Sequence, residues 1–251
     1  MSRKTLIQSV ERALNILETV RDSKTPIRAI DIAKTVGLSS AASNNIVRTL
    51  FERGYLDQNE NGRYVLGGQA HLFGLAADTW TELRNAARKP MIALSNATKS
   101  LSFLGVEYHS QIIAVNIVES TGPVIIPRNQ DWLNQFHSTA VGKILLAAIT
   151  PEKYEKLKEN YKLEKFTDKT ITDWTELEND ISRIRSRGYA VSCDESVFGI
   201  TSIAVPVCKK KETIAALSVV FSSYYLTKEF KENAISKLKL ASAEMTDGFS
   251  E

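Results

Sequence analysis

The sequence has few of the residues that build covalent or metal-bound frameworks. It contains two cysteines, Cys193 and Cys208, and three scattered histidines, so neither a disulfide framework nor a multi-ligand zinc site is expected. Its longest uncharged stretch, residues 213–227, has 15 residues and several hydroxyls, whereas a membrane helix needs about 18 or more apolar residues. The first twenty residues carry five charged side chains, unlike a signal peptide. We therefore expect a cytoplasmic protein with no membrane partner.

Motifs for catalysis are also missing. Residues 140–144 look like the end of a phosphate-binding loop, but His137 stands where the earlier glycine belongs and no Ser or Thr follows Lys143. His137 and Ser138 are neighbours without a nucleophile elbow. Cys193 precedes two acidic residues, which disfavour a thiolate. The sequence predicts neither an enzyme nor a bound cofactor or metal.

What is present is an ordinary globular composition with an uneven charge. Hydrophobic residues make up 43% and charged residues 24% of the 251 residues, which suits one or two folded domains. Residues 1–56 hold nine Lys and Arg against five Asp and Glu, while the rest of the chain is nearly neutral. A local positive excess is typical of a phosphate-binding module. An excess this small is also typical of an ordinary solvated surface.

The first part of the chain has the spacing of three helices. They are expected at residues 9–21, 29–36 and 40–53. In the first, Ser9 is the expected cap and one apolar stripe is expected to be buried, formed by Val10, Ala13, Leu14 and Leu17. The third is expected to bury Ile46, Val47 and Leu50 and to end before Gly54. The second and third helices, joined by a short turn with Gly37, predict a helix-turn-helix.

A hairpin follows directly. Residues 55–58 and 63–66 have strand character, and Asn61-Gly62 between them is a strong turn signal. A hairpin after a helix-turn-helix is the wing of a winged helix. Its third helix would enter the DNA major groove, where the first turns contact base edges.

The residues at the start of this helix are therefore candidate base contacts, and two arginines are candidate phosphate contacts. The predicted DNA-binding residues are Ser39, Ser40, Ala41, Ser43, Asn44, Asn45, Arg48 and Arg63. Small polar residues at a helix start also serve as plain caps. Two adjacent asparagines are harder to explain that way, because Asn is a poor helix former.

The rest of the chain predicts an α+β fold with helices packed on an antiparallel sheet. A helical stretch over residues 69–97, restarted by Pro90, would lead from the first domain into the second. Strands are expected at residues 101–106, 112–118, 122–126, 189–192, 201–207 and 213–221. Helices are expected at residues 139–149, 151–160, 173–187 and 228–249. Hydroxyls recur among the apolar residues of these elements, which suits a small-ligand pocket, although isolated Ser and Thr are common in strands without a ligand.

Five segments of the sequence resemble the IclR family of bacterial transcriptional regulators, and together they extend over nearly the full length of the chain. The matching segments are SVERALNIL (9–17), VGLSSAASNNIVRTLFERGYL (36–56), NGRYVLG (61–67), FHSTAVGKILLA (136–147) and IRSRGYAVSCDESVFGITSIAVPV (184–207). The resemblance implies a winged helix-turn-helix at residues 1–78, a linker helix at 79–98 and a GAF-like effector-binding domain at 99–251. It also implies a homodimer or tetramer that binds a palindromic operator in double-stranded DNA.

The resemblance further implies a small-molecule effector, a small carboxylate or an aromatic acid. The implied effector-binding residues are Phe136, Thr139, Ala140, Val141, Ser192, Ile200, Ser202, Ser218 and Val220, with Trp132 beside Phe136. Several positions depart from the common pattern. Ser39-Ser40 and Ala41-Ala42 stand where Pro-Lys and Ser-Thr are common at the start of the recognition helix. Asn45 stands where arginine is common, Ser192 where an acid is common, and Val220 where a serine can occur. The implied pocket is therefore less acidic and more apolar than those of some relatives.

The function predicted from sequence is a ligand-responsive DNA-binding regulator, a repressor or an activator. Two alternatives stay open at this point. One is a winged-helix protein whose C-terminal pocket is catalytic. The other is a winged helix that mediates interaction with protein or RNA instead of duplex DNA.

Overall fold

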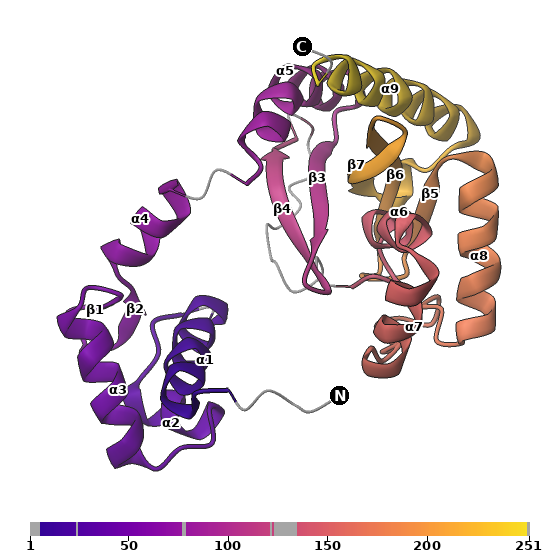
Figure 1. Ribbon diagram of the computed structural model, residues 1–251. Coiled ribbons are helices and arrows are strands. Elements are labelled where there is room, and N and C mark those ends of the chain that lie inside the picture. The colour runs from indigo at the N-terminus through magenta and orange to yellow at the C-terminus, as the bar shows by residue number, and fades with distance from the viewer. Residues whose placement is uncertain (1–5, 24, 77–78, 121, 123–134, 250–251) are drawn as a thin grey trace. The chain divides into compact units, whose positions relative to one another are not determined.

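The computed structural model describes residues 6–23, 25–76, 79–120, 122 and 135–249. They form two compact units, Met1–Thr79 and Trp80–Glu251, which we call the N-terminal and C-terminal units (Figure 1). The expected strand at residues 122–126 lies outside the described residues except for Gly122, and Trp132 also lies outside them.

The N-terminal unit is a winged helix. Its elements are α1 (Gln8–Asp22), α2 (Ala29–Thr35), α3 (Ser40–Glu52), β1 (Leu56–Gln58), β2 (Tyr64–Leu66) and α4 (Gly68–Ala76). The strands pair antiparallel around the predicted turn, and Gly62 there has φ +67°. Ile27 bridges to Tyr64 beside this hairpin. Gly54 follows α3 in the left-handed conformation that favours glycine, as predicted.

The core of this unit corrects the prediction for the first helix. The fully buried residues of α1 are Ile16 and Val20, while Val10 and Leu14 are exposed. Ser9 lies inside α1, and Ile7 occupies the cap position without a side-chain hydrogen bond. Both sides of α1 carry apolar residues at helical spacing, so periodicity alone did not identify the buried side.

The C-terminal unit is an α+β sandwich, as predicted. Its strands are β3 (Leu101–Tyr108), β4 (Gln111–Val118), β5 (Ala190–Cys193), β6 (Ile200–Lys209) and β7 (Glu212–Ser222). They form an antiparallel sheet in the order β4-β3-β7-β6-β5. Its helices are α5 (Thr81–Thr98), α6 (Ala140–Ala148), α7 (Pro151–Asn160), α8 (Trp174–Arg187) and α9 (Lys228–Asp247). A short 3-10 turn, η2 (Ser223–Tyr225), follows β7.

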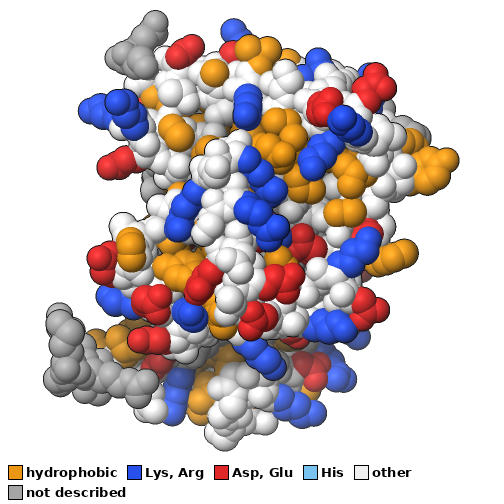
Figure 2. Space-filling view, turned by 90° about the vertical axis from the view of Figure 1, so that its right-hand side faces the viewer, with side chains coloured by type: hydrophobic (Ala, Val, Ile, Leu, Met, Phe, Trp, Pro, Cys, Tyr) orange, Lys and Arg blue, Asp and Glu red, His pale blue; other side chains and the backbone are white. Residues whose placement is uncertain are grey.

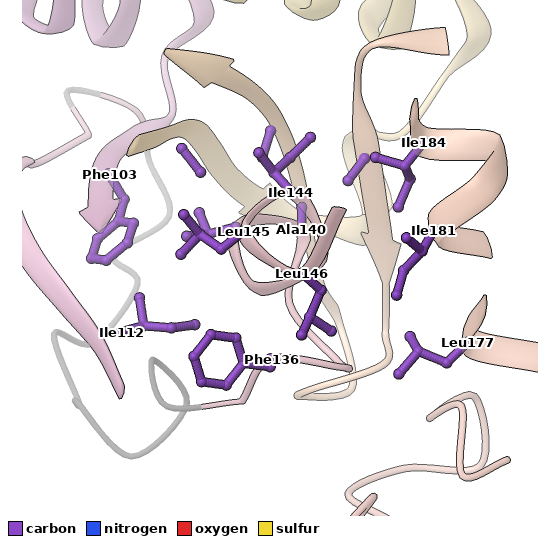
Figure 3. Close-up of a cluster of buried hydrophobic side chains, with 14 of the residues drawn as sticks. Phe103, Ile112, Phe136, Ala140, Ile144, Leu145, Leu146, Leu177, Ile181 and Ile184 are labelled. Atoms are coloured by element: carbon purple, nitrogen blue, oxygen red, sulfur yellow. The ribbon is translucent and has the colours of Figure 1, made fainter. Parts of the chain in front are cut away.

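The helices cover the two faces of the sheet separately (Figure 1). α5 and α9 pack on one face, where Met91 and Leu238 are fully buried. α6 packs on the other face with α8 beside it. Figure 3 shows the side chains of α6 between Phe103 of β3 on one side and Ile184 of α8 on the other.

Residues 69–97 do not form one restarted helix. α4 and α5 are separate, and Pro90 lies inside α5 without ending it. Pro90 has no N–H for the carbonyl of Ala86, but it is buried in the packed side of α5. α5, which covers most of the expected linker residues 79–98, packs within the C-terminal unit. On the face drawn in Figure 2, basic and acidic side chains are interspersed, with hydrophobic side chains visible between them.

Candidate DNA-binding surface and effector site

The candidate DNA-binding surface is one side of α3. Ser39 caps the helix, since its hydroxyl accepts the N–H of Ala42 at 3.3 Å. The side chains that follow on this exposed side are Ser40, Ala41, Asn44, Asn45 and Arg48. Positions 41, 44, 45 and 48 recur at three- and four-residue spacing, so they form one stripe. About two turns of one helix edge are thereby open to a groove.

Ser43 does not belong to this stripe. Its side chain is fully buried beside Val47 and Leu50, and its hydroxyl has no hydrogen-bond partner. A base edge cannot reach it, so the prediction for Ser43 as a DNA contact is wrong. Its spacing already carried the signal, because 43, 47 and 50 fall on the inward face of a helix.

The two arginines are available for phosphates. Arg63 is exposed on the hairpin, at the end of the turn that Asn59 organises through bonds to the N–H groups of Asn61 and Arg63. The guanidinium of Arg48 is 3.9 Å from Glu52, and both side chains are largely exposed. An exposed pair of this kind contributes little, so a phosphate could replace Glu52 at low cost.

Exposed apolar side chains occur on two other helices of the N-terminal unit. They are Leu6, Ile7, Val10 and Leu14 at the start of α1, and Leu72, Phe73 and Leu75 on α4. α4 has no buried residue, although Phe73 stacks on Tyr55 at 5.8 Å between ring centroids. Surfaces of this kind are typical of association sites. The sequence prediction of a buried Val10–Leu14 stripe missed the first of them.

The predicted effector residues gather where α6 begins. The register of the sheet places Ser192, Ser202 and Val220 side by side on β5, β6 and β7. The hydroxyl of Ser202 accepts the N–H of Ala140 at 3.3 Å, and the hydroxyl of Ser192 donates to the carbonyl of Ser138 at 2.6 Å. The structure therefore brings together residues that lie about fifty to eighty positions apart in the chain.

The turn before α6 is tightly packed and hydrogen-bonded. Thr139 caps α6, accepting from the N–H of Gly142 at 3.0 Å and donating to the carbonyl of Gln135 at 2.8 Å. A Cβ at Gly142 would collide with the backbone of Phe136. Val141 is buried in the core beside this turn. The positive end of the α6 dipole is thus held against the serines of the sheet, a setting that favours an anion.

In the part of the chain that the structure describes, three further predicted effector residues form no hydrogen bond with the start of α6. Ser218 lies under α6, and its hydroxyl points to the carbonyl of Phe103 at 3.4 Å. Ile200 is half-buried at the start of β6 and packs against the core beneath α6. Phe136 packs edge-on against Tyr161 and lines a separate cavity of about 390 Å³ near Leu157 of α7. Phe136 also belongs to the buried cluster with Ala140 and Val141, so its assignment to the effector set stays a prediction.

A buried hydrogen-bonded chain fixes the segment ahead of α6. The Nε2 atom of His137 is 2.9 Å from the carbonyl of Glu164, so it donates there, and Nδ1 accepts from the hydroxyl of Tyr161 at 2.9 Å. The same hydroxyl accepts the N–H of Phe136. Burial lowers the pKa of His137, chiefly by removing water from its charged form. This histidine is therefore a neutral part of the framework.

Sequence reasoning missed the charged cluster beneath α6. The Nζ atom of Lys143 is 2.9 Å from Asp180 and 2.7 Å from Glu195, and only 1% of its side chain is exposed. This is the lysine of the rejected phosphate-loop motif. The available signal was its position among six apolar residues of α6, since a lysine that is buried must be paired.

Two kinds of site are not found among the residues the structure describes. No group of three or more His, Cys, Asp or Glu could hold a metal ion. No helix in the described parts of the chain is long and apolar enough to cross a membrane.

Comparison with known proteins covers both units. The model of the IclR helix-turn-helix domain matches residues 9–60, and that of the bacterial transcriptional regulator IclR C-terminal domain matches residues 76–246. The HTH-type transcriptional regulator XynR of Escherichia coli is 32% identical over 216 residues, covering 85% of this chain and 86% of that regulator. A glycerol operon regulatory protein of Streptomyces coelicolor is 31% identical over 202 residues, covering 80% of this chain and 79% of that protein.

Two solved structures are similar in fold. An IclR transcriptional regulator from Alicyclobacillus acidocaldarius has a TM-score of 0.82 at 23% identity, with 98% of this chain and all of the other chain covered. An IclR homolog from Microbacterium hydrocarbonoxydans, complexed with 4-hydroxybenzoate, has a TM-score of 0.79 at 22% identity, with 96% and 99% covered. The relatives in these comparisons are regulators and not enzymes.

Proposed function

Because the chain belongs to the IclR family of bacterial transcriptional regulators, we propose that it reads an operator through α3 and changes its DNA affinity when the C-terminal unit binds a small organic acid. The observation that carries the DNA-binding part is the stripe of Ala41, Asn44, Asn45 and Arg48, which is exposed while Ser43, Val47 and Leu50 hold α3 in the core. Asparagine can bond to adenine through both its donor and its acceptor.

Binding to the DNA upstream of the protein's own gene and its neighbours tests this proposal. Fluorescence anisotropy against an unrelated duplex, at several salt concentrations, should give selective binding that weakens steeply with salt. Asn44→Ala and Asn45→Ala should each reduce binding to the operator by about 1–3 kcal/mol and relax base preference. Ser43→Ala is the matched control in the same helix and should bind normally. Equal losses on both duplexes would contradict base reading.

We propose a homodimer held in part by the exposed apolar side chains of α1 and α4. Two winged helices related by two-fold symmetry would meet two half-sites about one helical turn apart. Leu14→Glu and Leu72→Glu should shift the mass measured by light scattering towards the monomer and weaken binding to a full palindrome. Asn15→Lys, a charge change at an exposed position of the same helix away from this stripe, is the control. An unchanged mass in both glutamate variants would mean that other surfaces hold the assembly.

The effector part of the proposal rests on the join between α6 and the sheet. A small carboxylate or aromatic acid suits the positive end of α6 and the serine hydroxyls there, with Val141 and Val220 as apolar walls. Ser202→Ala removes the hydroxyl without adding volume, and Ser202→Leu fills the space. Both should abolish the effect of an acid on DNA binding, whereas exposed Ser182→Leu on α8 should not. A full response in the Ser202 variants would refute this site.

A further inference from the structure

The C-terminal unit contains a buried group of charges that does not balance. Lys143 of α6 supplies one ammonium, which hydrogen-bonds to Asp180 of α8 at 2.9 Å and to both carboxylate oxygens of Glu195 at 2.9 and 2.7 Å. The three side chains are 1%, 13% and 12% exposed. With both acids ionised, two carboxylates share one ammonium where little water reaches them. The nearest further cation, Arg187 of α8, is 3.7 Å from Asp180 and is itself partly exposed.

Protonation of Glu195 leaves Lys143 with one buried carboxylate, that of Asp180, which the partly exposed Arg187 also approaches. Burial raises the pKa of Glu195 to about 7, although the charge of Lys143 acts in the opposite direction. A carboxyl in this condition gains or loses its proton near neutral pH, and the proton exchanges with solvent. Its ionisation is favoured by any movement that lets water in.

The neighbouring charged groups do not take over this role. Asp194 is also largely buried, but hydrogen bonds from Lys169, Ser223 and the N–H of Gly199 outweigh its burial and lower its pKa. His137, whose charged form is disfavoured partly by Lys143, is neutral in its hydrogen-bonded chain. Of the groups facing the cluster, Glu195 is the one poised to change charge near neutral pH.

Two threonines hold the backbone of this region in place. The hydroxyl of Thr167 donates to the carbonyl of Asp194 at 2.6 Å, and that of Thr170 donates to the carbonyl of Glu195 at 2.6 Å. The backbone of Asp194 and Glu195 is therefore held to the segment that contains Thr167 and Thr170. A change of charge at Glu195 acts on its side-chain partner Lys143, and through Lys143 on α6.

The charged cluster of Lys143, Asp180 and Glu195 lies next to the first turn of α6, where the effector site is proposed. Lys143 lies one turn beyond Ala140, whose N–H donates to Ser202. Glu195 lies just beyond β5, whose Ser192 donates to the carbonyl of Ser138 ahead of the helix. The beginning of α6 is thus held to β5 and β6 by two hydrogen bonds, and one turn later Lys143 links α6 to Asp180 and Glu195.

We infer that Lys143, Asp180 and Glu195 are positioning residues of the effector site that form a proton-controlled latch. This inference rests on the proposed effector role of the site. With Glu195 protonated, α6 is seated on the sheet; when Glu195 releases its proton, the turn that contains Ala140 opens more often. An organic anion at the end of α6 adds negative charge near Glu195 and therefore binds together with a proton. The effector is held more tightly on the acid side of neutrality.

Amide hydrogen exchange of the free, full-length protein tests the latch without any effector or DNA. Peptides that cover the first turns of α6 are compared at about pH 6 and about pH 8, with labelling times scaled for the intrinsic exchange rate. If an opened Glu195 returns to the ordinary pKa near 4.5, the protection factor should fall about tenfold between these pH values. The Glu195→Gln variant should keep the higher protection at both.

The control is Glu178→Gln, which removes a half-exposed carboxylate on α8 that pairs with Lys158. This variant should keep the tenfold change. Asp180→Asn is a second test that leaves Glu195 itself unchanged. In this variant the ammonium of Lys143 meets one carboxylate, that of Glu195, so the pH midpoint of the change in amide protection should lie below that of the wild type. Exchange that does not depend on pH in the wild type, or the same pH dependence in Glu195→Gln, would overturn the latch. A protein that shows the latch but no response to acids would refute the proposed function instead.

Discussion

Replacing Lys143 with Met tests how much the buried charge contributes to the C-terminal unit. Methionine keeps an unbranched side chain of similar length but removes the ammonium. Asp180 and Glu195, whose side chains are only 13% and 12% exposed, then lose their buried cation. Breaking a buried ion pair from one side typically costs about 3–5 kcal/mol, because the remaining charge is uncompensated. Lys158→Met is the matched comparison. Lys158 meets Glu178 at a similar 2.8 Å, but these side chains are 34% and 44% exposed, and such pairs contribute about 0.2–1 kcal/mol.

Tryptophan fluorescence during urea unfolding measures this difference in the intact chain. All three tryptophans, Trp80, Trp132 and Trp174, stand after residue 79 in the sequence, and the two that the structure describes, Trp80 and Trp174, belong to the C-terminal unit. The signal therefore does not come from the winged helix. The midpoint should fall strongly for Lys143→Met and little for Lys158→Met. The slope with urea should stay unchanged if only stability is affected.

A third variant separates lost charge from lost packing. Replacing the whole cluster by apolar residues, as Lys143→Met with Asp180→Leu and Glu195→Met, should recover most of the stability, since buried ion clusters are often replaceable by well-packed apolar groups. Equal losses for Lys143→Met and Lys158→Met would refute the argument from burial. A triple variant as unstable as Lys143→Met would show that packing at residue 143, and not an uncompensated charge, is responsible.

Three further predictions concern the described sites. Ser43→Ala should stabilise the N-terminal unit by about 0.5–1 kcal/mol in thermal unfolding followed by circular dichroism, because a buried hydroxyl without a partner is removed; a loss of stability would mean that the hydroxyl has a partner. Arg48→Ala and Arg63→Ala should each weaken binding to all duplexes and reduce the slope of log affinity against log salt by about 1, and an unchanged slope would remove that arginine from the phosphate contacts. The pKa of His137 is lowered by burial, so its contribution to stability is present above about pH 6.5 and lost as the pH falls below that value; unfolding of His137→Gln should depend less on pH in that range, and an equal dependence would place the titration elsewhere.

Local signals in the sequence defined most of the fold. The helices expected at residues 139–149 and 173–187 begin one residue later, because Thr139 and Asp173 cap α6 and α8, and Gly188 follows α8 with φ +73°. Asn61-Gly62 located the wing. These features depend on residues within a few positions of one another, and their chemistry can be inferred without the tertiary structure.

Features that depend on distant partners were less predictable. In α1, residues 10 and 14 and residues 16 and 20 both have helical spacing, and only packing against the rest of the unit decides that Ile16 and Val20 are buried. Asp180 and Glu195 lie 37 and 52 positions from Lys143, so no local pattern linked them. The candidate effector residues at the start of α6 were proposed through a family resemblance, because hydroxyls in strands have no periodic signature.

The pairing of α5 with α9 has a consequence for the order in which the protein is made. Leu83, Ala87 and Met91 of α5 are buried in one cluster with Leu238 and Met245 of α9, yet α5 ends at residue 98 and α9 begins at residue 228. During translation, the winged helix can fold while α5 still exposes its apolar side and waits for its partner. A chain interrupted before α9 would therefore carry a winged helix beside an incomplete C-terminal unit, in which the apolar side of α5 stays uncovered and open to chaperones and proteases.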